Sequence, residues 1–147
     1  MAARNVIVFP TDFSPRSLEA LPWLRRMTDL LQAEVHVIYV IEEPQVYTTL
    51  DMGPVPIPSA TELADTARER LTRFISDAVA DFKTKPASAI LFGQPADEIV
   101  NYARETAASL LVMTTHGYSG VKHMLLGSTT ESVLRQATCP VLSIRAR

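Results

Sequence analysis

The chain has 147 residues, 47% of them hydrophobic, which is enough for one domain with a complete core but short for two. We therefore expect a single domain over residues 1–147. Fourteen basic and 16 acidic side chains give a formal charge of −2, which argues against binding to nucleic acid or to an acidic membrane by bulk charge. The single cysteine, Cys139, excludes an intramolecular disulfide and a cysteine-based metal cluster. No secretory signal or membrane-spanning apolar run is visible, so we expect a soluble cytoplasmic protein.

The first elements in chain order are a short strand, a helix and a second strand. Residues 6–9, VIVF, form a wholly apolar run, which is typical of a strand buried on both faces. Ser14, followed by proline, is a suitable N-cap for a helix running to about Leu31, and Pro22 should kink this helix or shift its start. Residues 35–41, VHVIYVI, are rich in β-branched side chains and predict the second strand.

The middle of the chain predicts a loop, a long helix and a further strand and helix. Residues 44–60 contain four prolines and a glycine, which predicts a long, mobile loop. From Glu62 to Lys83 apolar residues recur at three- and four-residue spacing, which predicts an amphipathic helix whose charged residues, Arg70 among them, form a solvated face. A strand over 87–92 and a helix beginning at Pro95 follow.

The last elements are a strand at 110–113, a helix at 128–136 and a strand at 139–144. The order β-α-β-α-β-α-β-α-β predicts an α/β fold: a single doubly wound, five-stranded parallel sheet with helices on both faces, Rossmann-like. In such sheets ligands bind beyond the carboxyl ends of the strands, where the winding direction reverses. If the first strand is central, the reversal lies between the first and fourth strands. The segments leaving them, 10–12 and 114–117, should then border a crevice.

The stretch THGYSGVKHMLLGSTTES, residues 115–132, carries three of the five glycines. Gly127 precedes Ser128, where a helix should begin, and the first amides of a helix attract anions such as phosphate. In a second interpretation Ser128 and Glu131 form a capping box and satisfy these amides themselves. Asp12 is similarly open to two roles, as a cap of the first helix or as a ligand contact. Neither GxxxxGK[ST] nor a GxGxxG after the first strand is present, so the residues alone leave both interpretations open.

Four further segments carry a resemblance to a known family: PTDFS at 10–14, HVIYVIEE at 36–43, GQPADEIVNYARETAASLLVM at 93–113 and CPVLSIR at 139–145. With the glycine stretch, they resemble the universal stress proteins of the UspA type, and within them the nucleotide-binding branch. Nucleotide-binding members carry a signature of G-x-x-G, nine residues, then G-S/T. Its positions are taken here by Thr114, Gly117 and Gly127–Ser128. Three positions depart from the family pattern: Thr114 replaces the first glycine, Tyr118 an often basic residue and Ser109 a frequently acidic one.

The resemblance implies an adenine nucleotide alpha hydrolase-like fold and a site for ATP, or for ADP or AMP. The residues implied to face the adenine and ribose are Pro10, Thr11, Asp12 and Val40. Those implied to wrap the ribose and α-phosphate are Met113, Thr114, Thr115, His116 and Gly117. Those implied to hold the β- and γ-phosphates are Gly127, Ser128 and Thr129. A divalent cation, Mg²⁺ or Mn²⁺, would be held through phosphate oxygens and water rather than by protein ligands.

The resemblance further implies a stress-response regulatory protein that works as a nucleotide-dependent homodimer paired through residues 140–145, with an unidentified regulatory partner. Pairing would also cover an apolar edge strand that is an aggregation hazard. The alternatives are a nucleotide-free dimeric partner-binding module, with the site disabled by Thr114, and a slow ATP hydrolase. Ser128, His116 and Asp12 could be drawn as a catalytic triad, but no GxSxG elbow is present and the glycine stretch offers only Lys122 as a cation. We therefore expect no catalytic residues and at most weak ATP hydrolysis.

Overall fold

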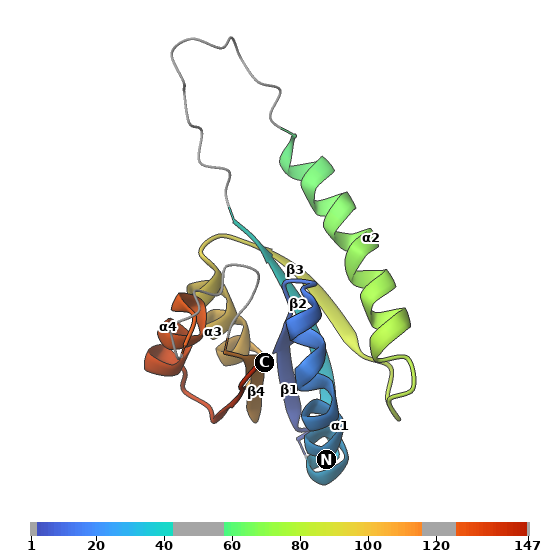
Figure 1. The fold of residues 1–147 in the computed structure, drawn as a ribbon, viewed down its shortest axis with the longest axis vertical. Helices are drawn as coiled ribbons and strands as arrows, with labels where there is room; N and C mark the ends of the chain where they lie inside the picture. Colours follow the sequence, from blue (N-terminus) through green and yellow to red (C-terminus); the bar gives the residue numbers. More distant parts are fainter. Residues whose placement is uncertain (1–2, 43–57, 116–125, 147) are drawn as a thin grey trace.

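The computed structural model describes residues 3–42, 58–115 and 126–146, and most of the loop predicted at 44–60 lies outside them. Five strands form one parallel sheet in the order β3-β2-β1-β4-β5 (Figure 1). The strands are β1 (Val6–Pro10), β2 (Glu34–Ile41), β3 (Ala87–Phe92), β4 (Leu110–Thr114) and β5 (Val141–Ile144). The first strand therefore lies in the centre, and the predicted doubly wound five-stranded parallel sheet is confirmed.

Helices cover both faces of the sheet because successive residues of a buried strand point to opposite sides. Ile7 and Phe9 of β1 pack in one core, under η1, α1 and α2, whereas Val8 between them packs in a second core with α3 and α4. Figure 1 shows the same division, with α1 and α2 on one side of the strands and α3 and α4 on the other. The helices are η1 (Pro15–Ala20), α1 (Leu21–Leu31), α2 (Ala60–Ala78), α3 (Pro95–Glu105) and α4 (Ser128–Gln136).

The segment after β1 contains two helices rather than one. Ser14 is the N-cap, as predicted, and its side chain accepts a hydrogen bond from the Ser17 N–H, but residues 15–20 form a 3₁₀ helix. The α-helix begins at Leu21, which places Pro22 in its first turn. Proline is tolerated there because a first-turn N–H has no intrahelical partner, so the predicted shift of the helix start is confirmed.

The helix α2 begins and ends earlier than predicted. It starts at Ala60 rather than Glu62 because Ser59 and Glu62 form a reciprocal capping box, with hydrogen bonds of 3.2 and 2.9 Å. It ends at Ala78 rather than Lys83, and the chain turns at the fully buried Val79, whose N–H donates to the Ile75 carbonyl. The apolar spacing continues into this turn, because Phe82 also packs against the core. The apolar periodicity alone therefore predicted an end of the helix that lies beyond the observed one.

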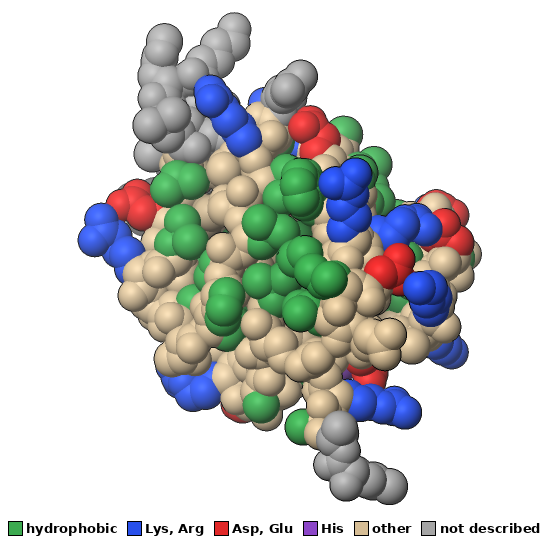
Figure 2. Space-filling model, turned by 90° about the horizontal axis from the view of Figure 1, so that it is seen from below, with side chains coloured by type: hydrophobic (Ala, Val, Ile, Leu, Met, Phe, Trp, Pro, Cys, Tyr) green, Lys and Arg blue, Asp and Glu red, His purple; other side chains and the backbone are tan. Residues whose placement is uncertain are grey.

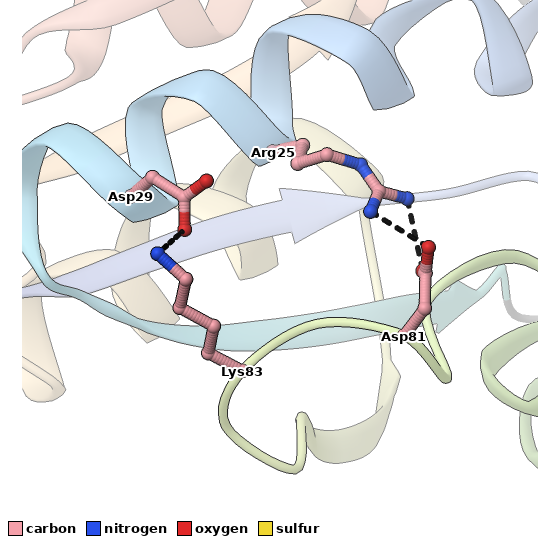
Figure 3. A network of polar contacts seen from close by, with 4 residues as sticks. All are labelled: Arg25, Asp29, Asp81 and Lys83. Atoms are coloured by element: carbon pink, nitrogen blue, oxygen red, sulfur yellow. Dashed lines mark hydrogen bonds and ion pairs between the residues drawn. The ribbon is translucent and has the colours of Figure 1, made fainter.

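Two ion pairs join α1 to the turn that follows α2 (Figure 3). The Arg25 guanidinium donates to both carboxylate oxygens of Asp81, at 2.7 and 2.9 Å, and its carbon lies 5.1 Å from the centre of the Phe82 ring. Lys83 lies 2.9 Å from Asp29. These contacts link the turn to α1 just before the chain enters β3. No helix in the described part of the chain is long and apolar enough to cross a membrane.

Candidate functional site

The two strands at the centre of the sheet separate at their carboxyl ends. β1 stays paired with β2 as far as Pro10 and Ile38, whereas its pairing with β4 is confined to Ile7 with Leu110 and Val8 with Leu111. The crossovers leave β1 toward one face and β4 toward the other, which is the arrangement that opens a crevice in doubly wound sheets. The crevice was predicted between the first and fourth strands, and the register places the opening there.

The segment leaving β1 is held in a compact turn. The Thr11 hydroxyl accepts a hydrogen bond of 3.0 Å from the Phe13 N–H and lies 3.2 Å from the Ser17 hydroxyl. The Asp12 carboxylate accepts from the Ser14 N–H at 2.9 Å. Since Ser14 is the helix N-cap, Asp12 shapes the turn before the helix instead of capping it. The Asp12 side chain is half-buried at the edge of the crevice.

The segment leaving β4 is tied to the first turn of α4. The Thr115 N–H donates to the Ile144 carbonyl at 2.8 Å, and the Thr115 carbonyl accepts from the Gly127 N–H at 2.6 Å. The Thr130 hydroxyl donates to the Thr114 carbonyl at 2.8 Å. These bonds fix the beginning of α4 beside the end of β4. His116 and Gly117, which belong to the predicted site, lie outside the described residues.

The N-terminus of α4 has no side-chain cap among the described residues. Gly127 occupies the N-cap position, and no side chain of a described residue accepts a hydrogen bond from the first amides. The alternative capping box of Ser128 and Glu131 is therefore not formed. Glu131 instead accepts a hydrogen bond of 2.8 Å from Arg135, one turn further on. The first amides of this nine-residue helix have no intrahelical partner, so they can bind an anion.

A cavity of about 620 Å³ occupies the crevice, within the range typical of small-molecule sites. Its wall includes every predicted site residue that the structure describes: Pro10, Thr11, Asp12, Val40, Met113, Thr114, Thr115, Gly127, Ser128 and Thr129. Thr114, which replaces a glycine of the family signature, forms part of the wall without closing the cavity. Sequence reasoning missed further lining residues, most notably Tyr39 and Arg70, the latter of which it assigned to a solvated helix face.

One buried hydroxyl in the cavity wall has no hydrogen-bond partner. Thr115 is only 6% exposed, yet its Oγ1 atom is unpaired among the described residues. A buried polar group without a partner is destabilising by about 1–3 kcal/mol, so such groups are rare unless a water, an ion or a ligand completes them. The Thr115 Oγ1 atom is itself buried beneath the wall surface, so the uncapped helix is the feature that fits a polar ligand at this end of the cavity.

The described residues hold no ready-made metal site. Within 3–42, 58–115 and 126–146, no group of three or more His, Cys, Asp or Glu side chains is placed to bind a metal ion. Asp12 and Glu42 line the cavity, but two carboxylates alone do not form a protein cage. The donor set thus fits a cation that receives most of its ligands from elsewhere, such as phosphate oxygens and water.

These features define a class: an α/β protein with a doubly wound parallel sheet and a polar ligand cavity at its switch point. The model of the Universal stress protein family matches residues 3–145. The chain therefore belongs to the universal stress protein family. It is 34% identical over 139 residues to Universal stress protein MJ0531 of Methanocaldococcus jannaschii. The alignment covers 95% of this chain and 81% of that protein.

Solved structures share the fold over nearly the whole chain. The structure of MJ0577, another universal stress protein of M. jannaschii, has a TM-score of 0.79 at 26% identity and covers 99% of both chains. A universal stress protein in complex with cAMP has a TM-score of 0.69 at 23% identity, covering 98% of both chains. One from Archaeoglobus fulgidus in complex with dAMP has a TM-score of 0.66 at 21% identity, covering 98% of this chain and 99% of the other. The last two resemblances show the common fold.

Proposed function

We propose that this universal stress protein binds an adenine nucleotide, ATP in the first place, in the cavity between β1 and β4. The observation that carries the proposal is the uncapped N-terminus of α4 in the wall of a cavity of about 620 Å³ that every described site residue lines. Two proteins of the same fold were solved with cAMP and dAMP, which supports an adenine nucleotide as the ligand class.

The polar end of the cavity suits the phosphates. The amides of Ser128 and Thr129 lie at the positive end of the α4 dipole, and Gly127 adds no side chain in front of them. Hydrogen bonds to charged groups contribute roughly 1.5–3 kcal/mol each, so a few of them approach the ~8 kcal/mol of a micromolar ligand. Mg²⁺ or Mn²⁺ would accompany the phosphates and neutralise part of their charge, with water completing its coordination.

The other end of the cavity suits the nucleoside. Val40 and Tyr39 come from the end of β2, and Pro10 and Asp12 from the end of β1. The resemblance assigns the adenine and ribose to this side, and Met113 and Thr114 lie between the two ends. A carboxylate such as Asp12 only accepts hydrogen bonds, which fits a hydroxyl or an amino group of the ligand.

We further propose that the protein acts as a stress-response regulatory homodimer rather than as an enzyme. β5 ends the sheet, and Leu142 and Ile144 on it are only partly buried. Figure 2 shows hydrophobic side chains gathered near the centre of one face of the molecule, with charged side chains around them. Pairing β5 with a copy of itself would satisfy its free backbone groups and cover part of its apolar surface.

Calorimetry with ATP, ADP and AMP tests nucleotide binding. The informative variant is Gly127→Asp, because aspartate is a favoured N-cap and retains the helix, while its carboxylate caps the amides and repels phosphate. We expect micromolar binding by the wild type and at least tenfold weaker ATP binding by the variant. The matched control is Ser59→Asp, which adds a carboxylate at the N-cap of α2, outside the cavity.

The wild type binding none of the three nucleotides at millimolar concentration would overturn the proposal and leave the nucleotide-free partner-binding module. Equal affinities of the wild type and Gly127→Asp would show that the phosphates do not bind at α4. Turnover of ATP that is lost in an Asp12→Ala and Ser128→Ala double variant would instead favour the hydrolase.

A further inference from the structure

The residue that follows Asp12 has an unusual backbone conformation. Phe13 has a φ of +63°, in the left-handed region that bulky side chains rarely adopt. The bond from its N–H to the Thr11 hydroxyl and the bond from the Ser14 N–H to Asp12 hold the turn in this shape. Backbone strain of this kind is concentrated at binding sites, where the surrounding structure enforces it. The side chains that the turn positions are therefore candidates for contacts with a ligand.

The strained turn places the Phe13 ring between three side chains at the edge of the cavity. Its centroid lies 4.6 Å from that of Tyr39 at an interplanar angle of 41°, and 6.0 Å from that of Phe74 at 65°. The guanidinium carbon of Arg70 lies 4.6 Å from the centre of the same ring. The Phe13 ring therefore supports the Arg70 guanidinium through a cation–π contact. Both Arg70 and Tyr39 line the cavity.

Arg70 has no charged partner among the described residues. In the part of the chain that the structure describes, it forms no ion pair, whereas Arg68, two residues away, is paired with Asp65 at 3.0 Å. Arg70 is also the one cationic side chain among the described residues of the cavity wall. Its neighbours Arg68 and Arg73 line a separate, shallow surface on the outer side of α2.

The position of Arg70 separates it from the phosphate end. Arg70 belongs to α2, which packs beside β2 and β3, and its guanidinium lies over the Phe13 ring, which contacts Tyr39 near the end of β2. The α4 N-terminus follows β4, on the far side of the central strand β1 and on the opposite face of the sheet. A nucleotide with its phosphates at Ser128 therefore extends its base toward β2 and Arg70.

We propose that the Arg70 guanidinium stacks on the face of the nucleotide base, as a further binding residue of this site. The inference rests on the proposed nucleotide binding. A guanidinium is planar and weakly hydrated, so it stacks on aromatic rings and on bases, and here it already lies over the Phe13 ring. Phe13, Arg70 and the base would form one stack at the nucleoside end of the cavity. Asp12 and Glu42, which also line the cavity, would accept hydrogen bonds from the edge of the base.

Calorimetric titration of the full chain with AMP and ATP tests the stack with three variants. Arg70→Ala removes the guanidinium and is expected to weaken AMP and ATP by the same factor of about ten, within the range for base-stacking side chains. Arg70→Lys keeps the charge but loses the plane, so it should behave like Arg70→Ala. Arg68→Ala is the matched control, since it removes an arginine of the same helix outside the cavity, and should bind like the wild type.

Each other outcome contradicts the stack. Wild-type affinity in Arg70→Ala would show that Arg70 does not contact the ligand. A loss that grows from AMP to ATP would place Arg70 at the phosphates, and wild-type affinity in Arg70→Lys would show that charge alone matters. A wild type that binds neither nucleotide would refute the proposed function itself, and the stack with it. Because Arg70 is exposed, its variants should fold, and equal melting temperatures without ligand check this.

Discussion

The hydroxyl of Thr130 donates a hydrogen bond of 2.8 Å to the carbonyl oxygen of Thr114. This bond joins the first turn of α4 to the last residue of β4, although a long segment of chain separates the two in sequence. Thr130 is buried, so the bond is shielded from water. The position of the α4 amides relative to the sheet thus depends on the Thr130 side chain and not on the ligand alone.

Replacement of this hydroxyl should affect stability and binding together. Thr130→Val keeps the shape of the side chain but removes the donor, so we expect the free energy of unfolding to fall by about 1 kcal/mol. Nucleotide affinity should fall a few-fold, because the start of α4 is held less firmly beside β4. Urea unfolding and calorimetry measure the two effects. Thr72→Val, at an exposed position of α2, is the control, and equal stabilities of the two variants would contradict the role of the bond.

The unpaired Thr115 hydroxyl leads to the opposite expectation for stability. Thr115→Val removes a buried polar atom without a partner and leaves both backbone hydrogen bonds of the residue in place. The empty protein should therefore gain about 1 kcal/mol of unfolding free energy. If the hydroxyl binds the nucleotide, the same variant should lose affinity several-fold, so that ATP raises its melting temperature less than that of the wild type. A variant that is less stable when empty, with unchanged affinity, would show that the hydroxyl has a structural role only.

The outline of the fold and most of the candidate site followed from local patterns. Apolar runs at β1 and β4 predicted buried parallel strands, and that topology brought Pro10 and Thr11 together with Thr114 and Thr115, which are about a hundred residues away in the chain. The pattern worked because burial on both faces leaves a strand few alternatives. It also identified the start of α4, where glycine and hydroxyl residues adjoin.

Features that depend on tertiary contacts could not be predicted. Arg70 lies on a charged helix face, and such a face has the same sequence whether it meets water or a cavity. The left-handed backbone of Phe13 has no glycine or asparagine to indicate it, since hydrogen bonds of the turn enforce it. The end of α2 was missed for a related reason, because Phe82 continues the apolar spacing but packs from a turn that ion pairs hold in place.

The ion pair between Arg25 and Asp81 should make part of the stability depend on pH (Figure 3). The hydrogen bonds from Arg25 hold the pKa of the Asp81 carboxyl below its usual value of 3.8. A carboxyl with a depressed pKa in the folded state stabilises the protein above its unfolded-state pKa, and this contribution is lost as the pH falls through the folded-state pKa. Asp81→Asn should therefore lower the melting temperature slightly at pH 7, with the difference from wild type shrinking below about pH 4.

Because both side chains are exposed, the effect at neutral pH should be small and should decrease further in high salt. The matched control is Asp77→Asn, an exposed carboxylate one turn earlier, at the end of α2. Thermal melts of the three proteins between pH 7 and pH 3 provide the measurement. A difference between Asp81→Asn and wild type that stays constant down to pH 3 would show that the substitution acts through packing and not through the ion pair.

The free edge of β5 allows dimerisation to be tested without disturbing the sheet. The carbonyl groups of Pro140 and Ile144 accept hydrogen bonds from β4, and alternate residues of a parallel strand direct their backbone groups to the same neighbour, so those of Val141 and Ser143 face the open edge. Ser143→Pro therefore removes an outward N–H and leaves the pairing with β4 intact. It also removes a buried hydroxyl that has no partner among the described residues.

We expect wild-type protein to sediment as a dimer and Ser143→Pro to sediment as a folded monomer, since proline on an edge strand blocks pairing with another strand. Ser143→Ala is the control, because it removes the same hydroxyl but keeps the N–H, and it should remain dimeric. Circular dichroism establishes that both variants are folded. A dimer that persists in folded Ser143→Pro would place the interface elsewhere, and a monomeric wild type at micromolar concentration would exclude the proposed homodimer.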